Sequence, residues 1–80
     1  MIRYIIEVIW FIEDKRVNGA EYSVPALDDL DFRSHVFKRW QESTQSAALQ
    51  RFPDVKMFFI TTRIRRVDQE FKAADLTIPN

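Results

Sequence analysis

The sequence predicts a two-layer α+β domain of ββαβ order, in which a three-stranded antiparallel sheet carries one main helix on one face. Three observations predict this fold. Residues 2–12 place apolar side chains on both sides of an extended chain, as a central strand does. Apolar residues between 32 and 48 recur at helical spacing. Residues 55–67 are rich in aromatic and β-branched residues, which is typical of a third strand.

The dipeptide Asn18-Gly19 predicts the hairpin between the first two strands, because a type I′ turn requires positive φ at both central residues. The first strand would then cover residues 2–17 and the second residues 20–24. This register pairs Arg16 with Glu21, which have opposite charges. Pro25 is expected to end the second strand because it cannot donate to a ladder.

Three aspartates predict the start of the helix, because acidic residues favour a helix N-terminus. They are Asp28, Asp29 and Asp31. The weak helix propensity of residues 43–46 predicts a kink or a split there, and Pro53 predicts an end near Arg51. A right-handed crossover then places the third strand beside the first, in the order 2-1-3.

The length of 80 residues predicts one domain, with residues 68–80 as a flexible or partner-docking tail that could begin with a short helix. Twelve basic residues balance twelve acidic ones, which argues against a general polyanion binder. The absence of cysteine excludes disulfides and zinc–thiolate sites, and a single glycine excludes glycine-rich phosphate loops. We therefore expect no enzyme activity, no cofactor and no metal.

The apolar N-terminal run does not fit a targeting segment. Glu7 interrupts the run, and Glu13 and Asp14 follow it without a small-residue cleavage site. It is also shorter than the roughly 20 residues that span a bilayer. We expect a cytoplasmic protein that makes no membrane contact, and a phage or mobile-element origin would suit a chain of this size.

The second face of the sheet is the candidate binding site. The helix is expected to cover Tyr4, Ile6, Val8, Trp10, Phe58 and Ile60. The opposite face would carry an apolar patch rimmed by charge, which is the usual anatomy of a protein interface. Its predicted partner-binding residues are Ile5, Ile9, Phe11, Met57, Phe59, Arg63 and Arg65. They predict a small regulator, inhibitor or adaptor that forms a homodimer or docks on a larger protein.

Two other arrangements stay open for these surfaces. The tail could fold back and cover the second face with Phe71, Leu76 and Ile78. A partner could instead pair with the edge of the second or third strand, since both edges expose free backbone groups.

Single-stranded nucleic acid is the alternative ligand, because bases stack on sheet aromatics while arginines hold phosphates. The arginines in question are Arg63, Arg65 and Arg66. The neutral chain and the missing glycine-containing motif of RNA-binding sheets weaken this alternative.

The remaining chemistry-bearing residues have structural explanations. His35 and Ser34 are adjacent on a helix and form a poor catalytic dyad, so His35 is expected on the surface, paired with Asp31. The aspartate cluster is explained by helix capping. Trp10 and Trp40 are expected to meet in the core between sheet and helix.

Overall fold

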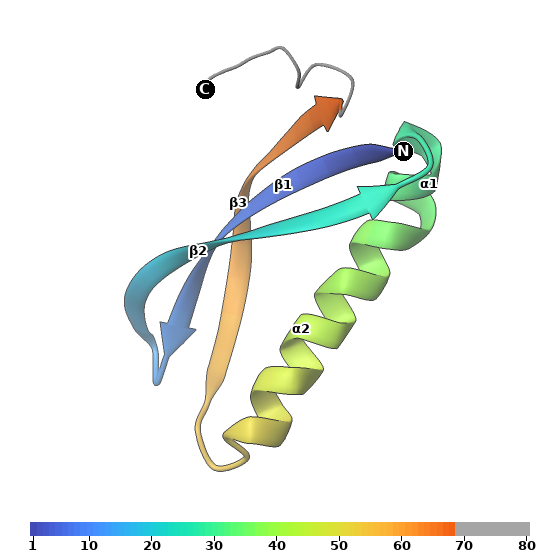
Figure 1. The fold of residues 1–80 in the computed structure, drawn as a ribbon. Helices are drawn as coiled ribbons and strands as arrows, with labels where there is room; N and C mark the ends of the chain where they lie inside the picture. The colour runs from blue at the N-terminus through green and yellow to red at the C-terminus, as the bar shows by residue number, and fades with distance from the viewer. Residues whose placement is uncertain (69–80) are drawn as a thin grey trace.

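A computed structural model describes residues 1–68 and contains the two predicted layers (Figure 1). The strands are β1 (Ile2–Ile12), β2 (Lys15–Ala26) and β3 (Met57–Asp68). The helical segment comprises α1 (Asp29–Asp31), the π-helical turn η1 (Phe32–Val36) and α2 (Phe37–Arg51). The sheet is antiparallel in the order β2-β1-β3, which confirms the predicted fold class. The expectations for the tail, including Phe71, Leu76 and Ile78, lie outside the described residues.

The hairpin turn lies at Glu13-Asp14, so its prediction at Asn18-Gly19 was wrong. Glu13 and Asp14 both adopt positive φ, at 50° and 66°, and Ile12 pairs with Lys15 across the turn. This earlier turn lets β2 run alongside the whole of β1. A turn at Asn18-Gly19 would have left most of β1, residues 2–10, without a neighbour on that side.

Strand β2 continues through Pro25 to Ala26, two residues beyond its predicted end. Pro25 pairs with Arg3 in the ladder. The position is tolerated because β2 is an edge strand, where a missing N–H need not interrupt a central ladder.

The helical segment begins with a reciprocal cap. The Asp28 side chain accepts from the Asp31 backbone N–H at 2.8 Å, and the Asp31 carboxylate accepts from the Leu27 N–H at 3.0 Å. The helix ends at Arg51, as predicted. It is regular through residues 43–46, so the predicted kink there was wrong. The irregular turn is η1, nearer the start.

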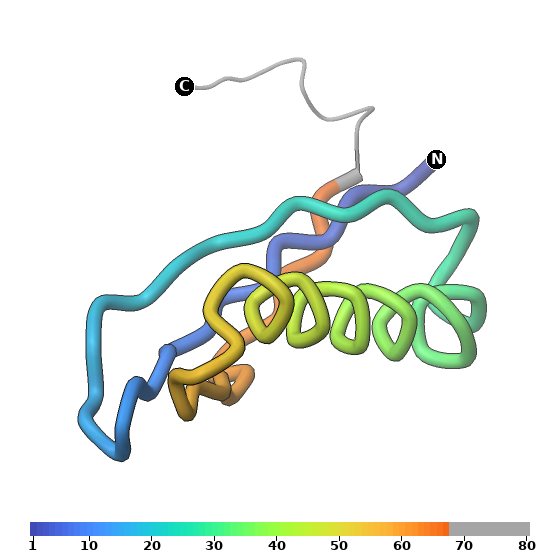
Figure 2. The backbone as a smooth tube through the Cα atoms, turned by 90° about the horizontal axis from the view of Figure 1, so that it is seen from below, coloured from blue at the N-terminus to red at the C-terminus, as the bar shows by residue number. Residues whose placement is uncertain are grey.

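The core lies between the sheet and the helical segment, which runs along one side of the strands (Figure 2). We call this covered side the helix face. Its buried side chains are Tyr4, Ile6, Val8, Ala26, Phe32 and Phe59. No helix within residues 1–68 is long and apolar enough to cross a membrane.

Aromatic contacts connect the two layers along the helix face. Tyr4 stacks on Phe32 at 3.9 Å between ring centroids. At the other end Phe59 lies between the two tryptophans, 4.9 Å from Trp10 and 5.4 Å from Trp40. Both tryptophans lie between the sheet and the helix, as predicted, but they are only partly buried and pack against the core, where Phe59 lies between them.

Candidate protein-binding face of the sheet

The opposite side of the sheet, here called the open face, is not covered by any other element within residues 1–68. Directly opposed residues of an antiparallel pair share a face, so the strand registers define its members. From β1 they are Arg3, Ile5, Glu7, Ile9 and Phe11. From β3 they are Phe58, Ile60, Arg63, Arg65 and Val67. From β2 they are Arg16, Gly19, Glu21, Ser23 and Pro25.

A bulge in β3 decides which of its residues reach the open face. Glu7 pairs with Arg63 and Val8 with Thr61, so Thr62 is an extra residue that reverses the alternation of faces. Its hydroxyl donates to the Glu7 carbonyl oxygen at 3.1 Å.

The bulge corrects four predicted positions. Phe59 is only 8% exposed in the core, and Met57 pairs with Ile12 on the helix face, so neither lies on the open face as predicted. Phe58 and Ile60, which were predicted under the helix, lie on the open face instead. The sequence does not reveal the change, because a Thr-Thr bulge contains no glycine or proline signal.

Five predicted site residues do lie together on the open face. They are Ile5, Ile9, Phe11, Arg63 and Arg65. The first three come from alternate positions of β1 before and beyond Glu7, and the two arginines come from β3 after the bulge. Phe58 and Ile60 extend the apolar part of this set.

The apolar half of the open face lies toward the hairpin. The Phe11 and Phe58 rings stack at 5.1 Å with nearly parallel planes. Phe58 is 39% exposed and its neighbour Ile60 is 46% exposed. Exposed aromatic and aliphatic side chains that touch one another form the kind of patch that a protein partner covers.

The centre of the open face is charged. Glu7 and Glu21 lie directly opposite each other, an unfavourable arrangement for two carboxylates. Arg65 lies near both, with its Nε 3.4 Å from Glu7 and its Nη2 3.9 Å from Glu21. The Nη1 atom of Arg63 lies 3.9 Å from Glu7 Oε2. The guanidinium groups thereby offset the repulsion between the carboxylates.

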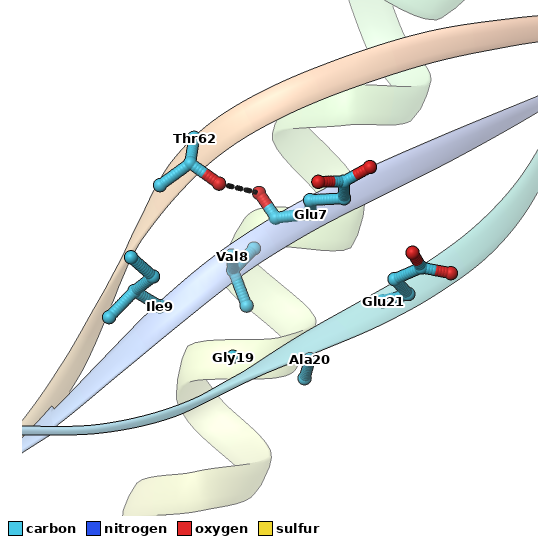
Figure 3. A pocket seen from close by; sticks show the side chains of 7 residues that line it. All are labelled: Glu7, Val8, Ile9, Gly19, Ala20, Glu21 and Thr62. Carbon is cyan, nitrogen blue, oxygen red and sulfur yellow. Dashed lines mark hydrogen bonds between the residues drawn. The ribbon is translucent and has the colours of Figure 1, made fainter.

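A hollow of about 440 Å³ lies at this centre (Figure 3). Its lining includes Gly19, Ile9 and the two glutamates, whose carboxylates point to the same side of the sheet. Gly19 adopts ordinary φ, but a Cβ there would lie 3.0 Å from the Val8 carbonyl oxygen. This close approach of β2 to β1 explains why residue 19 is a glycine. The absence of a side chain there also leaves the hollow open.

Arg66 lies on the helix face, apart from Arg63 and Arg65. Its Nη1 lies 2.9 Å from Asp29 Oδ2, and the Tyr4 hydroxyl donates to Asp29 Oδ1. The bond from Tyr4 and the charge of Arg66 hold the pKa of Asp29 below its ordinary value. Burial and the bond to Asp29 raise the pKa of Tyr4 to about 12. The three predicted nucleic-acid-binding arginines thus do not form one surface.

His35 has the expected surface position, with its Nδ1 3.4 Å from Asp31 Oδ1. Asp28 and Asp31 cap the start of the helix, whereas the Asp29 carboxylate is bonded to Tyr4 and Arg66. None of these side chains is aimed at the open face, which belongs to the other side of the sheet.

Comparisons of the chain with protein-family models, with curated proteins and with solved structures found no match in any of the three.

Proposed function

We propose that this protein is a small non-catalytic protein-binding module of the regulator, inhibitor or adaptor type, acting in the cytoplasm. Its open face packs against the open face of a second copy in a homodimer. The observation that carries the proposal is an apolar patch of half-buried Phe11 and exposed Phe58 and Ile60 beside a charged centre. Burial of such a patch contributes roughly 25 cal/mol per Å² of apolar area removed from water.

Charge on the open face supports a second copy as the occupant. A two-fold interface brings the same surface of both copies together, so it needs a surface that is complementary to itself. The open face has carboxylates at Glu7 and Glu21 and guanidinium groups at Arg16 and Arg63. Both signs of charge flank one apolar patch, so each copy can offer acidic and basic partners to the other.

Charge substitutions in the patch test the proposal. Phe11→Glu and Ile60→Glu should each convert the dimer to a monomer, because both place a carboxylate in the apolar contact. Analytical ultracentrifugation measures the change. Ile64→Glu is the matched control, since Ile64 has a similar exposure of 43% in the same strand but lies on the helix face.

The outcomes separate the possible occupants. A wild-type monomer at every concentration would contradict the homodimer. If a larger protein binds the monomer and Phe11→Glu abolishes that binding, the face would be a docking site for a foreign protein. Dissociation by Ile64→Glu, with Phe11→Glu still dimeric, would place the interface elsewhere.

Single-stranded nucleic acid is the second candidate ligand of this face. The stacked Phe11–Phe58 pair beside Arg63 and Arg65 favours it. The two glutamates at the centre of the face disfavour it, because Glu7 lies close to both arginines and Glu21 lies close to Arg65. A fluorescence anisotropy titration with labelled single-stranded DNA and RNA at low salt tests it. Absence of binding would eliminate this candidate, and binding lost in Arg63→Ala with Arg65→Ala would favour it.

A further inference from the structure

The two edges of the sheet differ in how open they are to a further strand. The edge of β2 contains Pro25, which has no N–H to donate, and a bulge where Val17 and Asn18 oppose Trp10. Both features hinder edge pairing. Strand β3 also has a bulge, at Thr62, but beyond it residues 63–67 pair with β1 without a register shift and contain no proline. Within residues 1–68 no strand pairs with their outer edge. Strand β3 is therefore the better site for a further strand.

The helical segment covers β1 but leaves part of β3 uncovered on the same face. Ile6 and Ile64 are directly paired, yet Ile6 is completely buried and Ile64 is 43% exposed. A hollow of about 370 Å³ lies at this border. Tyr4, Phe32 and Ile64 contribute its apolar lining, and Asp29, Arg33 and Arg66 its charged lining.

A strand that pairs with β3 beyond the bulge would pass this hollow. Residues 63–67 span roughly 15 Å at the rise of an extended chain. Alternate side chains of an added strand would point to the helix face, toward the hollow, and the others to the open face. Backbone hydrogen bonds would supply affinity, and the hollow would select side chains.

The chemistry of the hollow indicates which side chains it selects. Its aromatic and aliphatic lining favours apolar groups. Two guanidinium groups and one carboxylate give it a net charge of one positive unit at neutral pH. The Asp29 carboxylate is already bonded to Tyr4 and Arg66, whereas Arg33 is exposed at the rim. An acidic side chain is therefore the charged group that fits best.

We propose that the edge of β3 at residues 63–67 binds an extended acidic segment of a partner protein as a fourth strand. Apolar side chains of that segment lie against Tyr4, Phe32 and Ile64, and one aspartate or glutamate lies near Arg33. This surface is separate from the open face, so the inference does not depend on the homodimer.

Selection from a display library of random linear peptides against the full chain tests this inference. The expected peptides alternate apolar and other residues and contain an acidic residue. Arg33→Glu and Ile64→Asp should each weaken their binding about tenfold or more in fluorescence anisotropy, as loss of one well-placed contact does. Amide hydrogen exchange should slow in residues 63–67 when peptide binds.

Matched controls locate the site. Lys38→Glu reverses a charge on α2 away from the hollow, and Ile60→Asp alters the open face of the same strand; both should bind the peptides as the wild type does. The inference is overturned if no peptide is enriched, or if the enriched peptides bind Arg33→Glu and Ile64→Asp normally. It is also overturned if Ile64→Asp dissociates a dimer of the free protein, because a second copy would then occupy the edge.

Discussion

The two faces of the sheet both contain aromatic pairs, but only one face has a partner layer within residues 1–68. On the helix face Phe59 lies between Trp10 and Trp40 and is almost fully buried. On the open face the next residue along the chain, Phe58, stacks on Phe11 and stays 39% exposed. Adjacent phenylalanines therefore lie in different environments, one in the core and the other on the face that residues 1–68 leave uncovered.

Substitution of these two phenylalanines is the strongest test of that difference. Phe59→Ala should lower the free energy of unfolding by about 3–5 kcal/mol, because it removes a large buried ring and leaves a cavity. Phe58→Ala should lower it by about 1 kcal/mol, the size of an exposed stacking contact. Urea denaturation of dilute, monomeric protein measures both. Equal losses would contradict the assignment of the faces.

Gly19 tests the shape of the open face. Gly19→Ala would place a methyl group 3.0 Å from the Val8 carbonyl oxygen, in the backbone of the central strand. We expect a loss of about 1–2 kcal/mol, since the strain outweighs the usual small gain from replacing a glycine within a strand. Thermal and urea denaturation measure it. A variant more stable than the wild type would show that the two strands can move apart without cost.

Thr61 tests whether every polar group buried on the helix face has a hydrogen-bond partner. Its buried hydroxyl has no hydrogen-bond partner within residues 1–68. Thr61→Val keeps the side-chain shape and removes the buried polar atom, so it should raise the free energy of unfolding by about 1 kcal/mol. Thr62→Val is the contrasting variant, because it removes a bond to Glu7. If Thr61→Val destabilised the protein, its hydroxyl would have to be hydrogen-bonded.

Tyr4 and Asp29 give an effect that appears only when pH is changed. The pKa of Tyr4 is raised from 10.0 to about 12, so its stabilisation is complete below pH 10 and is lost as pH rises toward 12. The pKa of Asp29 is lowered, so its contribution is present above the ordinary value near 4 and is lost as pH falls through the lower value.

Tyr4→Phe should reduce both pH dependences and keep the stacking on Phe32. Urea denaturation midpoints of the variant and of the wild type, recorded below pH 10, above pH 10 and in acid, give the difference in stability at each pH. Identical pH profiles for the two proteins would mean that the hydrogen bond between Tyr4 and Asp29 does not form in solution.

The sequence predicted the layers and the strand order, because the alternation in β1, the helix caps and the aromatic third segment each determine an element locally. It misplaced the turn, because Asn18-Gly19 has the strongest local turn signal, whereas pairing along the whole of β1 favours Glu13-Asp14. It assigned Phe58 and Phe59 to the wrong faces of the sheet. One extra residue in β3, Thr62, reverses which face the side chains point to and leaves no mark in the composition.

The sequence likewise predicted only part of the candidate site. Ile5, Ile9 and Phe11 follow from the alternation of the central strand alone. Arg63 and Arg65 lie beyond the bulge, where the assumed alternation agrees with the real one. The pairing of Glu7 with Glu21 and the hollow over Gly19 depend on the hairpin register, which the sequence did not reveal.

The isoleucines offer the most direct test of the claim that the open face binds a second copy, because they lie on both faces. Methyl NMR spectra of isoleucine-labelled protein would be recorded across a dilution series. The account predicts that the Ile9 and Ile60 methyl signals shift as the dimer dissociates, while those of Ile6 and Ile64 do not. Spectra that are independent of concentration, or shifts confined to Ile64, would contradict it.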